Sequence, residues 1–191
     1  YDALKLVNKE VNEYSNIKGI LAKFKVGSTF KAKRNIANKG MKITLPTTSS
    51  YTSKAVKPKV VVKDAGITLK KDKDYTVQYK NNVKTGKATI TIKGKGNYTG
   101  SKTINFYIVP KKVTISSVKP GKKQLTVKYK KVTGASGYQI AYSTSKSKGF
   151  KYITVNSKTV SKVIKKLKSK KNYYVKVRAY KSVGKKKYYG D

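Results

Sequence analysis

Hydrophobic and polar residues alternate in short runs along most of the chain from Met41 onwards. The first series of runs is KITL, KVVVK, YTVQY, ATITIKG and TINFYIV, and the second is VTISSV, QLTVKYKK, GYQIAYSTS, FKYITV, SKVIKKL and NYYVKVRAY. Such runs, rich in β-branched and aromatic residues and separated by Gly, Asn, Asp and Lys clusters, are typical of strands with one buried face. Two series of this kind predict two small β-sandwiches in series.

The stretch before these runs has a different pattern. Apolar residues recur at helical spacing in residues 1–16, which predicts a short amphipathic helix. Residues 17–41 include AKFKVGSTFKAKRN, which alternates like a pair of short strands. Pro110 and the lysines after it mark a second boundary. We therefore predict an N-terminal segment at 1–41, with a short helix and possible strands, one sandwich at 42–109 and another at 110–191.

The last of the runs shows how the many charges fit this pattern. In NYYVKVRAY one strand face would hold Tyr173, Val175, Val177 and Ala179, and the other Tyr174, Lys176, Arg178 and Tyr180. The basic residues then lie on the solvated side of a folded strand. The strand pattern alone is enough to explain why these residues are basic. A binding role would need further evidence.

The composition excludes several classes of catalytic and metal site. The chain of 191 residues has no His and no Cys, which removes Ser–His and Cys–His nucleophile systems and the usual zinc ligands. Its acidic residues number 7, and Asp72 and Asp74 form the one close pair, in the turn-like KKDKDY. We predict no catalytic, cofactor-binding or metal-binding residues and no cofactor, and we expect that the chain is not an enzyme. An intramolecular Lys–Asn crosslink would need a buried acid beside it, for which Asp64 and these two are the candidates in the middle domain.

The charge balance is extreme, with 47 basic against 7 acidic residues and a net charge of +40. Only Arg34 and Arg178 are arginines, whereas base readout and phosphate clamps favour Arg, so the composition disfavours dedicated nucleic-acid binding. Two interpretations stay open: a lysine coat that contacts anionic polymers, and a bland charged surface that keeps the protein soluble. The candidate polyanion contacts are Lys176, Arg178, Lys185, Lys186 and Lys187.

The second series of strands resembles a fibronectin type III domain. QLTVKYKKVTGASGYQIAYS is similar to the B strand, BC loop and C strand of that family, with Tyr129 where the family usually carries a core Trp. Leu167 precedes Tyr173 by the spacing of the family's tyrosine corner, which implies a bond from the Tyr173 hydroxyl to nearby backbone. The chain ends KKKYYGD where the family continues into a full strand G, so we expect this strand to be short or truncated. An unpaired edge would favour self-association.

The first series resembles an Ig-like repeat found in tandem in surface proteins of Gram-positive bacteria. The similar stretches are YTSKAVKPKVVVKD, LKKDKDYTVQYKNN and GKATITIKGKGNYTG. The resemblance implies structural roles in turns and core for Asp74, Tyr75, Asn97 and Tyr98. Together the resemblances imply an all-β fold of two Ig-like/fibronectin type III-like β-sandwiches in series, with a short, partly helical N-terminal segment.

From these resemblances we expect a fragment of a secreted or cell-surface (cell wall) protein of a Gram-positive bacterium. It would be a non-catalytic spacer or adhesion module whose lysine-rich faces make weak contacts with anionic cell-wall polymers, acidic glycans or host surface proteins. The alternative is a set of accessory modules of a secreted hydrolase with its catalytic domain upstream. No apolar run is long enough to predict a transmembrane segment. The sequence leaves the oligomeric state open.

Overall fold

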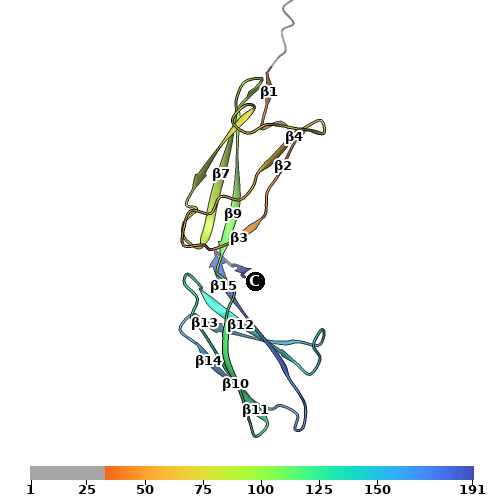
Figure 1. Ribbon diagram of the computed structural model, residues 1–191, viewed down its shortest axis with the longest axis vertical. Helices are drawn as coiled ribbons and strands as arrows, with labels where there is room; N and C mark the ends of the chain where they lie inside the picture. Colours follow the sequence, from red (N-terminus) through yellow and green to blue (C-terminus); the bar gives the residue numbers. More distant parts are fainter. Residues whose placement is uncertain (1–32) are drawn as a thin grey trace, which may run out of the picture. The chain divides into compact units, whose positions relative to one another are not determined.

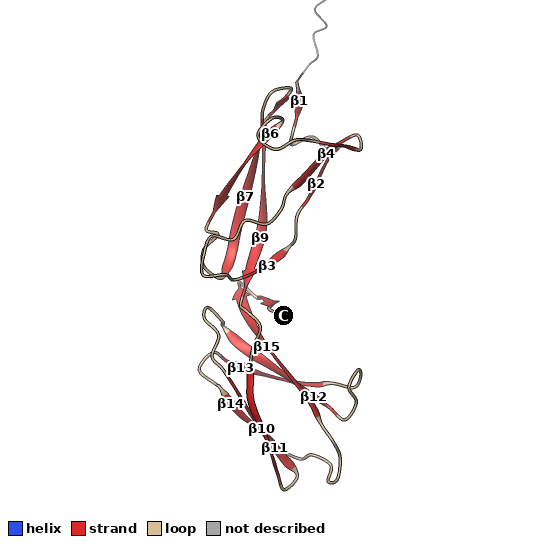
Figure 2. Ribbon diagram, viewed as in Figure 1, coloured by secondary structure: helices blue, strands red, loops and turns tan. Residues whose placement is uncertain are grey.

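The computed structural model describes residues 33–191, in which every regular element is a β-strand (Figures 1 and 2). This confirms the predicted all-β fold. The helix expected within residues 1–16, and most of the strand pair expected within 17–41, lie outside the described residues. Within the described part, no helix is long and apolar enough to cross a membrane.

The first sandwich is built from two main sheets and one short pair of strands. Strands β3 (Thr48–Ser50), β9 (Ser101–Val109), β7 (Gly86–Gly94) and β6 (Tyr75–Lys80) form a four-stranded sheet in that order. Strands β2 (Met41–Thr44), β4 (Val61–Asp64) and β5 (Ile67–Thr68) form a three-stranded sheet, and β1 (Arg34–Asn35) pairs in parallel with β8 (Tyr98–Thr99).

Alternation in β7 explains why this segment is a central strand. Ala88, Ile90 and Ile92 are fully buried, whereas the threonines between them are half-buried on the other face. The hairpin that joins β6 to β7 begins at Asn81, whose φ of 58° lies in the left-handed region that Asn tolerates better than most residues. The alternation along β7 and the residue at the turn therefore both favour this hairpin.

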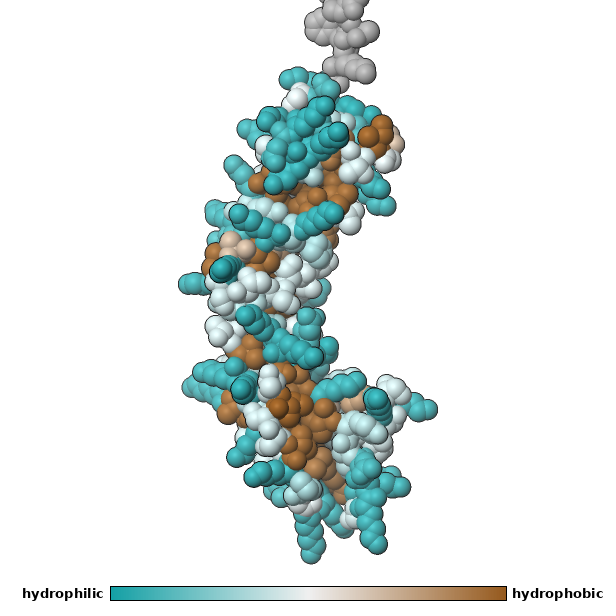
Figure 3. Space-filling view, viewed as in Figure 1, coloured by the Kyte–Doolittle hydropathy of each residue, from teal (hydrophilic) through white to brown (hydrophobic). Residues whose placement is uncertain are grey.

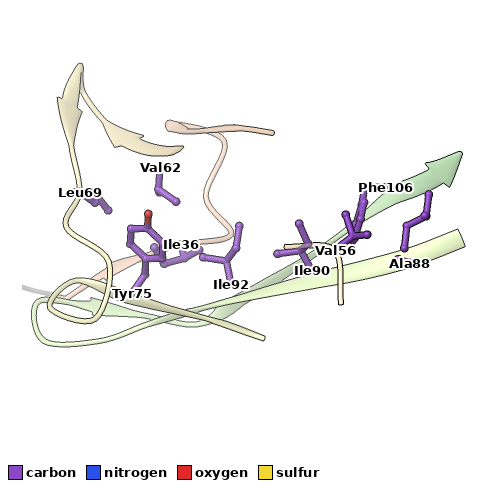
Figure 4. Packing of buried hydrophobic residues seen from close by; sticks show 10 residues of the cluster. Ile36, Val56, Val62, Leu69, Tyr75, Ala88, Ile90, Ile92 and Phe106 are labelled. Atoms are coloured by element: carbon purple, nitrogen blue, oxygen red, sulfur yellow. The ribbon is translucent and has the colours of Figure 1, made fainter. Parts of the chain in front are cut away.

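The first hydrophobic core begins before the expected boundary at residue 42. Ile36 is fully buried and packs in one cluster with Val62, Tyr75 and Ile92 (Figure 4). Its N–H donates to the carbonyl of Thr99 at 2.9 Å, just after the β1–β8 pair. Residue 36 thus belongs to the first sandwich and not to the predicted separate segment at 1–41. The other domain bounds stay predictions.

The second sandwich pairs a three-stranded sheet with a four-stranded one. The smaller sheet has the order β10 (Ile115–Gly121), β11 (Gln124–Tyr129) and β14 (Ser161–Ile164). The larger sheet has the order β13 (Lys151–Asn156), β12 (Gly137–Ser143), β15 (Tyr174–Val183) and β16 (Lys186–Tyr189). All neighbouring strands in both sheets are antiparallel.

Tyrosine takes the place of large apolar residues in the second core. Tyr138 is fully buried and Tyr129 is 3% exposed, and their ring centroids lie 4.9 Å apart in a tilted arrangement. The Tyr138 hydroxyl accepts a hydrogen bond from the N–H of Val132 at 2.9 Å. Ile140, Val177 and Ala179 are buried in the same cluster. Their inward positions match the alternation in the sequence.

Candidate functional site

The outer face of the larger C-terminal sheet carries aromatic and cationic side chains together. Directly paired residues on neighbouring strands project to the same face. The pairing aligns Tyr152, Ala141 and Lys176 in one row, and Gln139 with Arg178 in the next. Tyr180 faces Tyr189 across β15 and β16, and Lys187 faces Ser182. We call this surface the outer face, defined by Phe150, Tyr152, Lys176, Arg178, Tyr180, Lys187 and Tyr189.

Each cation of the outer face lies over an aromatic ring. The Lys176 ammonium is 4.5 Å from the centroid of the Phe150 ring, and that of Lys187 is 4.9 Å from the Tyr180 centroid. The Arg178 guanidinium lies 3.9 Å from the Tyr189 centroid. These are cation–π distances, which restrict where the charges can move.

Arg178 is held more firmly than the two lysines. Its Nε and Nη2 donate to Oε1 of Gln139 at 3.0 and 2.7 Å, while Tyr189 covers one face of the guanidinium. A guanidinium carries five donors in all, so those that make no bond to a described residue can meet an anion. An ordered guanidinium loses less entropy on binding than a mobile one.

Gly137 makes room for the aromatic part of the outer face. It pairs with Tyr180, and a Cβ atom at position 137 would collide with the Val155 carbonyl oxygen and the Tyr180 hydroxyl. Tyr180 is therefore only 8% exposed although it lies on the solvent side of the sheet. This close approach could not be read from alternation alone.

The structure places the predicted polyanion contacts in three different locations. Lys176, Arg178 and Lys187 lie on the outer face. Lys186 pairs with Val183 and projects to the opposite side, where its ammonium is 5.2 Å from the Tyr188 ring centroid. Lys185 is exposed in the turn between β15 and β16. The binding role of all five stays a prediction.

The residues carried by the fibronectin resemblance lie in or beside the second core. Tyr129 and Leu167 are buried, and Tyr173 is half-buried. The Tyr173 hydroxyl accepts a hydrogen bond from the N–H of Lys168 at 3.0 Å, which fixes the chain just before β15. Burial raises the pKa of Tyr129 to about 12, with a smaller effect from Tyr138.

The residues carried by the Ig-like resemblance form turns and core in the first sandwich. Asp74 accepts the N–H of Lys70 at 2.7 Å and so closes the turn before β6. Tyr75 is buried, and its hydroxyl donates to the carbonyl of Val60 at 3.3 Å. Asn97 is exposed and its carbonyl accepts the N–H of Arg34 at 3.1 Å.

Of the three candidate acids of the middle domain, Asp64 is the buried one, and its partners are an arginine and a tyrosine. Asp64 is 4% exposed, its Oδ1 lies 2.8 Å from Nη2 of Arg34, and its Oδ2 accepts the Tyr98 hydroxyl at 3.2 Å. Burial, and then the Asp64 charge, raise the pKa of Tyr98. The described contacts of Asp64 are thus with Arg and Tyr, which gives no support to a Lys–Asn crosslink there. Among residues 33–191 no cluster of acids has the arrangement of a metal site.

The outer face combines cations with aromatic rings, an arrangement whose chemistry suits contact with an anion. Its cations are spaced by alternate strand positions, about 7 Å along β15 between Lys176 and Arg178. An extended polyanion with repeated charges could meet several of them at once. Exposed Tyr152, at 59% exposure, adds a flat ring on which a sugar or apolar group could rest.

No known protein-family profile matches the chain. A curated relative, described as a Kelch domain-containing protein of Sulfurisphaera tokodaii, is 34% identical over 112 residues, which cover 56% of this chain and 15% of that protein. The match thus spans about a seventh of the length of this relative.

Two solved structures of fibronectin type III domains are similar in part. The FN1–FN3 domains of chicken CNTN1 match at a TM-score of 0.38 and 15% identity, over 78% of this chain and 62% of that one. A two-domain fibronectin type III segment of chicken tenascin matches at a TM-score of 0.40 and 15% identity, over 78% and 80%. These scores are too low to transfer a ligand or an activity to this chain.

Proposed function

We propose that this chain is a non-catalytic adhesion or spacer module that contacts anionic polymers through the outer face. The observation that carries the proposal is the set of three cations, Lys176, Arg178 and Lys187, each placed over an aromatic ring on one sheet face. The polymers in question are anionic cell-wall polymers or acidic glycans. The protein would be secreted or attached to the surface of a Gram-positive bacterium.

Electrostatics supports contact with polyanions over a broad range of partners. A net charge of +40 draws any polyanion towards the molecule, and neutralised charges release counterions. The ordered cations of the outer face then supply the positions at which the polymer binds. The lysines scattered over the rest of the surface add long-range attraction but do not determine where the polymer binds.

The test compares two triple variants that remove the same charge from opposite sheets of the second sandwich. The outer-face variant is K176Q/R178Q/K187Q, and the matched control is K119Q/K122Q/K128Q, in or beside β10 and β11, where these lysines are exposed. Binding to isolated Gram-positive cell walls is measured before and after removal of teichoic acid. We expect the outer-face variant to lose about tenfold in affinity and the control about twofold or less.

Equal losses in the two variants would show that the charge of the whole coat matters and that the outer face has no special role. Binding by the unmodified protein that survives removal of teichoic acid would contradict an anionic wall polymer as the partner. Circular dichroism of both variants, recorded first, shows whether each retains the β-sheet fold.

A further inference from the structure

One end of the second sandwich collects lysines from three connections that are distant in sequence. The N–H of Leu167 donates to the carbonyl of Lys123 at 3.0 Å, and Ser143 at the end of β12 pairs with Tyr174 at the start of β15. Figure 1 places these connections at the lower end of this sandwich, and Figure 3 shows hydrophilic side chains projecting there. We call this region the loop end, defined by residues 122–123, 144–150 and 165–173.

A small pocket opens at the loop end, where the second core meets solvent. It has a volume of about 280 Å³, and the connections that follow β12 and β14 form its walls. Its lining side chains include three cations and two aromatic rings, from Lys151, Lys166, Lys168, Tyr142 and Tyr173. All of its lining residues belong to the range 142–173, so neither β16 nor the residues after it form part of the site.

The strand position of Lys151 differs from that of a lysine on a solvated sheet face. Along β13, Ile153 and Val155 pack against the second core, so alternation directs Lys151 to the same side. It pairs with Tyr142, which also packs against that core. An apolar residue is the usual choice at a core-facing position. Lysine here instead brings an ammonium group to the mouth of the core.

The backbone gives an independent indication that positive charge is favoured at the loop end. Among residues 110–191, the residues other than Gly with positive φ are Lys123, Lys166 and Lys170, with φ of 52°, 59° and 54°. Left-handed backbone favours Gly and Asn, and other side chains there cost free energy. Within residues 34–109 the corresponding positions hold Ser53, Ala65, Asp72 and Asn81. A general abundance of lysine therefore does not explain the three at the loop end.

Hydrogen bonds hold the backbone on both sides of the pocket. Ser143 is 6% exposed, and its hydroxyl donates to the carbonyl of Lys148 at 2.7 Å. The same hydroxyl accepts the N–H of Ser145 at 3.0 Å, which holds the loop after β12. On the other side the Tyr173 hydroxyl accepts the N–H of Lys168. An anion that binds here orders side chains but not these loops, which lowers the entropic cost of binding.

The size and charge of the pocket favour a compact anion with several oxygen atoms. Lysine binds phosphate as a point charge with three donors. The sequence has no Asp or Glu between residues 75 and 190, and among the described residues none that lines the pocket is acidic. A liquid water molecule takes about 30 Å³, so about 280 Å³ accommodates a phosphate group with a short polyol attached. The rings of Tyr142 and Tyr173, with centroids 6.4 Å apart, offer surfaces for the carbon atoms of the polyol.

We propose that this pocket binds a single phosphate ester group. Lys151, Lys166 and Lys168 surround the phosphate oxygens, and the two tyrosine rings lie beside the attached polyol. The same chemistry occurs in soluble glycerol phosphate and in the headgroup of phosphatidylglycerol, and the experiment below distinguishes these sources. The site uses none of the residues of the outer face, so it does not rest on the proposed function.

The probe is glycerol phosphate, titrated against the full chain while amide signals are followed by NMR. We expect a Kd of about 1 mM, with signal changes concentrated in residues 142–151 and 166–168. Glycerol, which lacks the phosphate, should cause no change. The second proton of a phosphate monoester has a pKa of about 6, so the ester gains negative charge as the pH rises. Its affinity should therefore increase by about threefold or more between about pH 5 and pH 7.

Two triple variants that lose the same charge distinguish the pocket from general attraction. The pocket variant is K151Q/K166Q/K168Q, and the matched control is the outer-face variant K176Q/R178Q/K187Q. We expect the pocket variant to lose about tenfold or more in affinity for glycerol phosphate and the outer-face variant about twofold or less. Equal losses, or signal changes spread over all the lysine-rich strands, would overturn the proposal.

Lys166→Asn tests the site even if the triple variant fails to fold. Asn tolerates left-handed backbone better than Lys, so the midpoint of urea denaturation should stay the same or rise. The affinity for glycerol phosphate should fall by about threefold because one charge is lost. Lys165→Asn, at an exposed neighbouring position outside the pocket lining, is the control. An equal fall in affinity for both variants would contradict the role of Lys166.

Vesicles of phosphatidylcholine with and without phosphatidylglycerol distinguish the sources of the phosphate. Binding that needs phosphatidylglycerol and is lost in the pocket variant, but not in the outer-face variant, identifies a lipid headgroup. Binding of glycerol phosphate without such vesicle binding identifies a soluble or polymer-borne ester. If glycerol phosphate fails to bind at about 10 mM while wall binding still depends on the outer face, this site is rejected and the proposed function is kept.

Discussion

At the scale of single residues, the buried hydroxyl of Tyr129 destabilises the second core. It is buried and has no hydrogen-bond partner among the described residues, whereas the adjacent Tyr138 hydroxyl is bonded to Val132. A buried hydroxyl without a partner costs free energy that an apolar ring of the same shape avoids. Residue 129 therefore tolerates loss of its oxygen better than residue 138 does.

We expect Tyr129→Phe to raise the free energy of unfolding by about 1 kcal/mol at neutral pH, and Tyr138→Phe to lower it by about 1 kcal/mol. Urea denaturation followed by tyrosine fluorescence measures both values. A lower stability for Tyr129→Phe would show that this hydroxyl has a partner that matters in the folded protein.

Tyr129 should also make stability fall at alkaline pH. Burial raises its pKa from the ordinary 10.0 to about 12, so the unfolded chain loses this proton before the folded one does. The stability from the proton is complete below pH 10 and declines as the pH rises from 10 to about 12. Denaturation between these pH values should show a shallower decline in Tyr129→Phe than in the unmodified protein.

Gly137 is the residue on which the aromatic part of the outer face depends. Gly137→Ala places a methyl group against the Val155 carbonyl and the Tyr180 hydroxyl, and we expect a loss of about 2 kcal/mol in unfolding free energy. Chemical denaturation gives the value. Gly66→Ala is a poor control because Gly66 has a φ of +86°. A Cβ at position 40 meets only Nη2 of Arg34, at 4.0 Å, which is an ordinary contact, so Gly40→Ala should cost less. Equal costs at 137 and 40 would contradict the close approach.

At the scale of elements, an ion pair adds to the backbone pairing that ties the short strand β1 to the first sandwich. The Arg34 side chain is 56% exposed, whereas that of its partner Asp64 is 6% exposed. Loss of the exposed partner leaves a buried carboxylate with the Tyr98 hydroxyl alone. Loss of the buried partner leaves an arginine that water can solvate.

Arg34→Ala should therefore cost about 2–3 kcal/mol of stability, more than an exposed side chain normally does. The double variant R34A/D64N should recover part of this loss because Asn removes the buried charge. Lys33→Ala, at the neighbouring exposed position, serves as the control and should change stability by less than about 0.5 kcal/mol. Identical values for Arg34→Ala and Lys33→Ala would refute the role of the pair.

At the scale of the whole molecule, the salt dependence of the binding affinity distinguishes general electrostatic attraction from contact at the outer face. The slope of log affinity against log salt counts the charges that neutralise the polymer, and each lost contact lowers it by about one. Binding to teichoic-acid-containing walls should show a slope reduced by about two to three in K176Q/R178Q/K187Q. The control K119Q/K122Q/K128Q should keep the slope of the unmodified protein.

Much of the architecture was predictable because it depends on local alternation. Inward Val175, Val177 and Ala179, and outward Lys176 and Arg178, follow from the period of a strand, and the two series of runs predicted two sandwiches. Ile36 and the Arg34–Asp64 pair were not predictable. Both depend on contacts between segments distant in sequence, which no periodicity records.

By itself, the sequence determined the all-β class, the facing of side chains along each strand and a surface rich in lysine, because these depend on the order and type of neighbouring residues. Only the tertiary structure decided which cations share the outer face, because strand pairing brings Lys187 of β16 beside β15. Strand pairing is a non-local choice, so the surfaces to which we assign function emerge only when the sheets have formed.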